Sequence, residues 1–182
     1  MSETSPSVEA RLQAIEDRLA IYNLLATHPL SADTGEQALI DAIYTDDVVF
    51  DRGAGLEGAR GREAMVQLVS RHEHHAAIAG GLAHFGSLPL VDLDGDTAVA
   101  VSYLALITPD PHGEPWELAN HGTSQAYRIH RVLANRWTLE RCGDGWRIAS
   151  RTLLPTDGSG PALDLLREAG ASYLQTVKAR QR

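Results

Sequence analysis

The sequence predicts an α+β fold, in which a curved antiparallel sheet is covered on one face by N-terminal helices. Up to residue 79, apolar residues recur three or four positions apart, which is the spacing of amphipathic helices. From residue 83 onward, long alternating stretches are separated by turns that contain Gly and Asp. Helices followed by strands, rather than alternating with them, are typical of an α+β domain.

The first predicted helix covers residues 7–27, because its apolar residues share one helical face. Pro29 is expected to close this helix, since proline has no backbone N–H to donate. A short second helix is predicted at 36–44, with Leu39 and Ile43 on its buried side.

A Gly-rich stretch at 53–61 is predicted to be a connecting loop. It lacks both the Gly-Lys-Ser/Thr of a P-loop and the strand-to-helix fingerprint of a dinucleotide site, so phosphate binding is not expected there. A third helix follows at 62–79 and is stopped by Gly80 and Gly81.

The remaining elements are strands and one last helix. The turn sequences at 92–96 and 143–145 contain Asp-Gly pairs, which favour tight hairpins between antiparallel neighbours. The predicted strands lie at 48–51, 83–91, 97–107, 123–141 and 146–154, and the final helix at 162–178.

The composition excludes several classes of partner. The chain of 182 residues has a net charge of -8 and its basic residues are scattered, which argues against binding to nucleic acid or to an anionic membrane. No uncharged apolar run approaches the ~20 residues that cross a bilayer. The only cysteine, Cys142, cannot form an internal disulfide, so a cytoplasmic location is expected.

The chain length suits a single domain, which we place at residues 8–157. Residues 1–7 are polar, carry no signal-peptide pattern and are expected to be disordered. Residues 158–182 are expected to form a C-terminal helical extension.

Three helices cannot completely fill the concave face of a curved sheet, so a cone-shaped cavity between helices and sheet is the expected binding site. Alternation along the strand at 123–141 divides its side chains between two faces. The face expected to line the cavity carries Arg131, Leu133, Asn135 and Trp137. The outer face keeps apolar side chains such as Val99, Val101 and Tyr103, and a second copy of the chain, in a homodimer or higher homo-oligomer, is the simplest partner to cover it.

Asp33 and His84 are the main candidate functional residues. Asp33 lies just after the predicted end of the first helix, and His84 lies in the apolar stretch 81–86. A carboxylate and an imidazole on largely apolar elements form either a structural hydrogen bond or a proton-transfer couple. The alternatives are a helix cap or loop turn for Asp33 and a hydrogen-bonded core residue for His84.

The cluster at 72–75 contains three histidines and one glutamate, residue types that are typical of a metal site. His72 and His75 would share one helical face, but no third ligand at a suitable spacing is evident. A solvated helix end is therefore the preferred interpretation, and no metal is predicted.

The order of these elements resembles the SnoaL-like branch of the NTF2-like superfamily over residues 8–157. This branch comprises cone-shaped α+β domains that include polyketide cyclases, scytalone dehydratase, ketosteroid isomerase and a dehydrochlorinase. The stretches that carry the resemblance are 20–33, 44–47, 82–86, 94–98 and 145–149.

The resemblance implies a cofactor-independent active site built on an Asp/His couple. Asp33 falls where the dehydratase and dehydrochlorinase members carry the aspartate, and His84 falls where they carry the histidine. His84 would then be the general base, and Asp33 would orient its ring and stabilise the imidazolium. The tyrosine that accompanies the aspartate in scytalone dehydratase is replaced by Ala32, and neither the ketosteroid isomerase pair nor an epoxide-hydrolase set is evident.

Five further residues are candidates for substrate binding. Asn135 could hold a carbonyl or a developing oxyanion, and Arg151 could do the same, although Ser150 is nearer to the position of the dehydrochlorinase's pocket cation. His28 lies one turn before Asp33, either in the pocket or at a surface helix end. The complete candidate set is His28, Phe50, Leu104, Asn135 and Arg151.

The expected function is that of a lyase, isomerase or cyclase that removes a proton from a hydrophobic, aromatic or polyketide-like small molecule. Two alternatives remain open. One is a catalytically silent binding protein, and the other is an accessory subunit of a larger enzyme, like the small chain of ring-hydroxylating dioxygenases.

Overall fold

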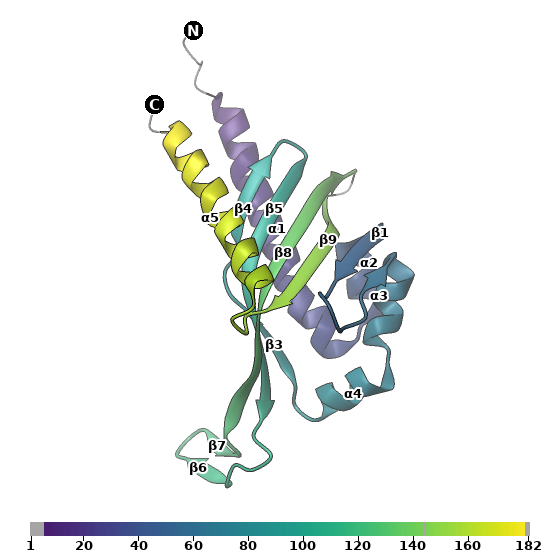
Figure 1. Cartoon of the computed structure of the whole chain (residues 1–182). Helices are drawn as coiled ribbons and strands as arrows, with labels where there is room; N and C mark the ends of the chain where they lie inside the picture. Colours follow the sequence, from purple (N-terminus) through teal and green to yellow (C-terminus); the bar gives the residue numbers. More distant parts are fainter. Residues whose placement is uncertain (1–5, 144, 181–182) are drawn as a thin grey trace.

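The computed structural model describes residues 6–143 and 145–180. Their main feature is a curved sheet with the strand order β2-β1-β9-β8-β5-β3, in which β4 also pairs with β5 (Figure 1). Helix α1 crosses one face of this sheet and α5 crosses the opposite face, while α2 and α3 flank the edge near β1 and α4 lies beyond the end of α1. The predicted α+β class is confirmed. The disorder expected at residues 1–7 falls, for residues 1–5, outside the described residues.

Helix α1 (Val8–Thr34) is longer than predicted. It begins after Ser7, whose hydroxyl accepts a hydrogen bond from the Ala10 N–H at 3.1 Å. It ends at Gly35, which has a φ of 68° and donates its N–H to the Ser31 carbonyl.

The prediction that Pro29 closes the helix is wrong, because Pro29 lies inside α1. A proline within a helix removes one backbone hydrogen bond and crowds the preceding turn. Leu30, which follows it, is exposed, but His28 and Ser31 in the same turn are buried, and the Ser31 hydroxyl donates to the His28 carbonyl at 2.8 Å. Tertiary packing and this local hydrogen bond thus outweigh the local preference of proline.

Helix α2 (Gln37–Ile43) confirms the predicted second helix. It leads into β1 (Tyr44–Asp51), which is followed by the short β2 (Ala59–Arg60). Strands β1 and β9 run parallel, whereas the other strand pairs described here are antiparallel, as expected.

The single helix predicted at 62–79 is in fact two helices, α3 (Arg62–Val69) and α4 (His72–Ala79), which are separated at Arg71, an extended residue. Helix α3 is anchored by the buried Met65, whereas α4 has no buried residue. A hydrogen bond of 2.7 Å between the His74 ring and the Ala32 carbonyl docks α4 on the end of α1 instead.

The strand predicted at 83–91 is also divided, into β3 (Ala83–Gly86) and β4 (Leu90–Asp94). The break contains Pro89, which cannot donate to a strand ladder. The long strands β5 (Thr97–Pro109), β8 (Tyr127–Cys142) and β9 (Gly145–Pro155) were predicted within a few residues of their ends. Strands β6 (Trp116–Leu118) and β7 (Gly122–Ser124) form a separate hairpin at the tip of an arm that extends beyond the helices (Figure 1).

The buried residues form two clusters on opposite faces of the sheet. The larger cluster lies between the sheet and the N-terminal helices and includes Ile21, Ile40, Tyr44, Leu104 and Trp137. The smaller cluster lies under α5 (Gly160–Arg180) and includes Val101, Ala134, Ala162 and Leu165.

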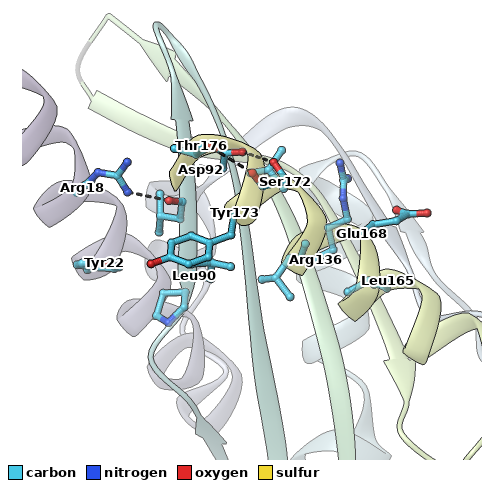
Figure 2. A pocket seen from close by; sticks show the side chains of 15 residues that line it. Arg18, Tyr22, Leu90, Asp92, Arg136, Leu165, Glu168, Ser172, Tyr173 and Thr176 are labelled. Atoms are coloured by element: carbon cyan, nitrogen blue, oxygen red, sulfur yellow. Dashed lines mark hydrogen bonds between the residues drawn. The ribbon is translucent and has the colours of Figure 1, made fainter. Parts of the chain in front are cut away.

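The outer face, which we expected to be covered by a second copy, is thus covered in part by the chain's own α5. Tyr103 on this face is still 47% exposed, and oligomerisation through it stays a prediction. Between α5, α1 and β4 lies an outer groove of about 440 Å³, lined by Tyr22, Leu90, Asp92, Leu165 and Tyr173 among others (Figure 2).

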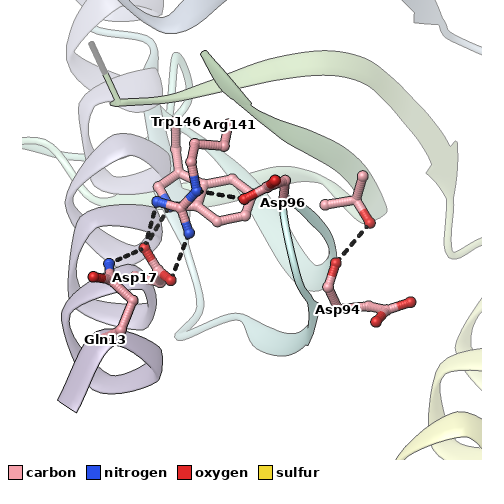
Figure 3. A network of polar contacts seen from close by, with 7 residues as sticks. Gln13, Asp17, Asp94, Asp96, Arg141 and Trp146 are labelled. Atoms are coloured by element: carbon pink, nitrogen blue, oxygen red, sulfur yellow. Dashed lines mark hydrogen bonds and ion pairs between the residues drawn. The ribbon is translucent and has the colours of Figure 1, made fainter. Parts of the chain in front are cut away.

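A network of ion pairs links α1 to the adjacent ends of β5, β8 and β9 (Figure 3). Arg141 donates two hydrogen bonds to the Asp17 carboxylate at 2.8 and 2.7 Å, and the Trp146 indole donates a third at 3.1 Å. Arg141 also pairs with Asp96 at 2.8 Å. These bonds, with that to Arg141 the largest cause, lower the pKa of the buried Asp17 carboxyl to about 2.

None of the described helices has both the length and the apolarity needed to cross a bilayer.

Candidate active site

The structure brings Asp33 and His84 into direct contact. Asp33 lies in the last turn of α1 and His84 is the second residue of β3, so the pair joins helix and sheet. The His84 Nδ1 lies 2.6 Å from one carboxylate oxygen, and the backbone N–H of His84 donates to both oxygens at 3.2 and 3.1 Å. An ionised carboxylate only accepts hydrogen bonds, so Nδ1 carries the proton and Nε2 is the free basic nitrogen of neutral His84.

The environment of His84 keeps its ring neutral near pH 7. Its side chain is 13% exposed, against 30% for that of Asp33. Burial lowers the pKa of His84 below its usual value, and the hydrogen bond and charge of Asp33 oppose that effect. The unprotonated form, which can accept a proton, is therefore the prevalent one at neutral pH.

His28 is buried, so the alternative of a surface helix end is wrong. Its Nδ1 lies 2.9 Å from the Tyr44 hydroxyl, and its ring meets that of Trp137 edge to face, with 5.0 Å between centroids. Burial holds the pKa of His28 well below its usual value and raises the pKa of Tyr44 to about 12, so both side chains are neutral. The buried Nε2 of His28 has no hydrogen-bond partner among the described residues.

Arg151 points into the interior from β9 and is only 4% exposed. Its Nε donates to the Asn135 side-chain oxygen at 3.0 Å, and its guanidinium lies 4.7 Å from the centre of the Phe50 ring and 4.6 Å from that of Trp137. Burial lowers the pKa of Arg151 to about 10, which leaves it charged at neutral pH. The neighbouring Ser150 is bonded to Thr138 instead, so the cation that this strand directs into the interior is Arg151.

Two cavities meet at His84. The first, which we call the arginine chamber, has a volume of about 370 Å³ and is lined by Phe50, Arg52, Met65, Arg71, His74 and Arg151 among others. The second, which we call the tryptophan chamber, has a volume of about 520 Å³ and is lined by Tyr22, Leu25, Phe85, Leu88, Asn135 and Trp137 among others. His28, His84 and Leu104 line both chambers and form the boundary between them.

The candidate residues named from the sequence therefore gather around this double cavity. Each of the five proposed binding residues lines at least one chamber, and Asp33 supports His84 from behind. Sequence reasoning missed Arg52, which lies between β1 and the Gly-rich loop. It also placed His74 at a solvated helix end, whereas the His74 ring lies 6.2 Å from that of His84.

The described residues contain no group of three or more His, Cys, Asp or Glu side chains that could hold a metal ion. The histidines at 72–75 do not converge on one point, because the His74 ring is engaged with the Ala32 carbonyl.

A cone-shaped α+β domain with a cavity between its N-terminal helices and a curved sheet defines the NTF2-like class of proteins. Within this class the chain belongs to the SnoaL-like domain family, whose family model matches residues 13–152. No curated protein sequence is significantly similar to the chain.

Solved structures share this fold. An NTF2-like protein with a cystatin-like fold from Novosphingobium aromaticivorans is 33% identical, with a TM-score of 0.76 over 87% of this chain and 94% of that one. A protein of unknown function from Mycobacterium tuberculosis is 21% identical, with a TM-score of 0.61 over 84% and 78% of the two chains. A type 2 hexachlorocyclohexane dehydrochlorinase (LinA) is 13% identical, with a TM-score of 0.60 over 80% and 89%.

Proposed function

We propose that the protein is a cofactor-independent lyase, isomerase or cyclase that removes a proton from carbon in a hydrophobic, aromatic or polyketide-like small molecule. The observation that carries this proposal is the 2.6 Å contact between His84 Nδ1 and Asp33, with the His84 ring at the boundary of two cavities. A structural hydrogen bond alone would not require the ring to line two cavities.

In the proposed reaction, His84 Nε2 accepts the proton of an activated C–H bond. The electron pair of that bond moves into an adjacent carbonyl, forming an enolate, or expels a leaving group from the neighbouring carbon. The imidazolium that forms is stabilised by the Asp33 carboxylate. For isomerisation the same proton returns to another carbon of the enolate. General base catalysis of this kind contributes roughly 10²- to 10⁴-fold in rate.

Asn135 is proposed to donate to the carbonyl oxygen that gains charge. Its side-chain oxygen accepts from Arg151, so its amide N–H groups are the ones left to donate into the tryptophan chamber. The charge of Arg151 polarises this amide and strengthens it as a donor. A well-placed donor of this type contributes about 3 kcal/mol to transition-state stabilisation.

Membership of the SnoaL-like family supports a reaction without a cofactor. The fold shared with a hexachlorocyclohexane dehydrochlorinase is consistent with a lyase-type step. The residues Asp33 and His84 are proposed for this role on the geometry of this chain.

The test is hydrogen–deuterium exchange in D₂O, followed by NMR, on a panel of aromatic ketones with acidic C–H bonds. We expect the protein to accelerate exchange of at least one member, and His84→Gln to abolish this effect. His130→Gln, a change at an exposed histidine outside both chambers, is the matched control and should keep full activity. Ligands that bind without any accelerated exchange would contradict catalysis and support the silent binding protein.

A further inference from the structure

The arginine chamber has a charge opposite to that of the whole chain. The protein carries a net charge of -8, yet the charged residues that line this chamber are Arg52, Arg71 and Arg151, with Glu73 the one carboxylate among them. Arg71 is neutralised by Glu57 outside the chamber, at 2.7 Å. Arg52 and Arg151, opposed by Glu73 alone, therefore leave the chamber with a net positive charge.

Arg151 is a buried cation without a carboxylate partner. Among the described residues its polar partners are the neutral side chains of Asn135 and Tyr44, and its guanidinium also lies over the faces of Phe50 and Trp137. One of its terminal nitrogens, Nη2, is buried and has no hydrogen-bond partner. An isolated charge in a protein interior costs several kcal/mol unless an opposite charge or further hydrogen bonds compensate for it.

Arg52 repeats this pattern on the same aromatic ring. Its guanidinium lies 5.8 Å from the centre of Phe50, the ring that also contacts Arg151. Its Nε is buried without a partner, and its other bond is a long one of 3.4 Å to the Glu57 carbonyl. Burial, then the charges of Arg131 and Arg71, lower the pKa of Arg52, and the charge of Glu57 opposes this effect.

We infer that the arginine chamber binds the carboxylate of the ligand, and hence that the substrate is a small apolar acid. Two guanidinium groups with unused N–H donors, which both lie beside the Phe50 ring, match the two oxygens and the charge of a carboxylate. The apolar body of the ligand extends past His84 into the tryptophan chamber. This inference rests on the proposed function for the position of the reacting carbon, while the binding step stands independently of catalysis.

The test is isothermal titration calorimetry of the whole protein with 2-naphthoate and with 2-naphthamide, a neutral molecule of nearly the same shape. Hydrogen bonds to a charged group contribute about 1.5–3 kcal/mol, so we expect the carboxylate to bind roughly 10- to 100-fold more tightly than the amide. In Arg52→Gln, which changes a half-buried residue and should fold, this preference should fall about tenfold. Arg151→Gln should abolish it, with a melting curve as the control for folding.

Arg136→Gln is the matched control, because it removes the same charge from the outer groove. It should keep the full preference for the carboxylate. Equal affinity for the two probes, no binding of either at millimolar concentration, or an equal loss in Arg136→Gln and Arg52→Gln would overturn the inference.

His84→Gln separates this inference from the proposed function. If this variant still prefers the carboxylate, the anion site stands even where no C–H exchange is found. If exchange of neutral ketones depends on His84 but the carboxylate preference is absent, the proposed function stands and the inference fails.

Discussion

The arginine chamber and the outer groove have similar volumes, about 370 and 440 Å³, but their polar groups are bonded very differently. In the outer groove, Arg18 donates to the Val91 carbonyl at 2.7 Å and the Ser172 hydroxyl donates to Asp92 at 2.5 Å (Figure 2). In the arginine chamber, Arg52 and Arg151 keep buried donors without partners. Buried hydrogen-bond donors without an acceptor, rather than volume, therefore distinguish the arginine chamber from a gap between packed elements.

Among the mutations that test this comparison, the largest expected effect is on catalysis by His84, where the two chambers meet. Asp33→Asn keeps the shape of the side chain but removes the charge that stabilises the imidazolium, and we expect kcat to fall roughly 10²-fold. Because Asp33 raises the pKa of His84 against the effect of burial, its loss lowers that pKa further. The acid limb of the pH–rate profile should therefore move to lower pH.

A profile that keeps its acid limb in Asp33→Asn would show that the carboxylate does not act on the base. Thr34→Ser, a change at the exposed next residue, is the control for disturbance of the helix end.

The next largest effect is on stability at the outer face. Leu165 is 7% exposed and packs in the cluster with Val101 and Ala134, so Leu165→Ala should cost about 2–3 kcal/mol in the free energy of unfolding. Denaturant titration measures this loss. Activity at the inner site should change less than twofold, and a large drop in kcat would show that the two faces are coupled.

A smaller effect concerns the ion-pair network on Asp17, and it depends on pH. The pKa of Asp17 is lowered from 3.8 to about 2, so the charged form favours folding by about 2 kcal/mol at neutral pH. This stabilisation is complete above the unfolded pKa of 3.8 and is lost as the pH falls through about 2. Asp17→Asn should lose stability at pH 7 and show a weaker decline in stability over that acid range, which thermal melts at several pH values would reveal.

The smallest effect is expected inside the outer groove. Ser172→Ala removes one half-buried hydrogen bond to Asp92 and should cost about 1 kcal/mol without a change in activity or in ligand affinity. If it weakened the binding of 2-naphthoate instead, the outer groove and not the arginine chamber would be the ligand site.

Much of the fold follows from local patterns in the sequence. The pairings of Asp94 with Thr97 and of Cys142 with Gly145 close the two predicted hairpins. Alternation placed Asn135 and Trp137 on the face that lines the tryptophan chamber, whereas Arg131 and Leu133, expected on the same face, line neither chamber. The errors occurred where contacts between residues distant in sequence determine the local structure. Pro29 stays helical because His28 and Ser31 in the same turn are buried, and the helix expected at 62–79 breaks where α4 docks on α1.

The site was predictable only in part. Asp33 and His84 were matched through resemblance to a family, since a separation of 51 residues gives no local signal for their contact. Arg52 lies at the start of a Gly-rich loop without periodicity, so no pattern showed which way it points. The surplus of positive charge in the arginine chamber could not be predicted either, because the composition gives only the net charge of the whole chain, which is negative.

The stacking of Arg151 on Trp137 has a practical consequence. The indole lies 4.6 Å from a guanidinium in the interior, and indole emission is sensitive to the electric field of such a neighbour. An anion that enters and neutralises that field should change the emission spectrum, while Trp116 and Trp146 lie outside both chambers. The domain thus contains an intrinsic optical reporter of its own occupancy, with which unlabelled compounds could be screened.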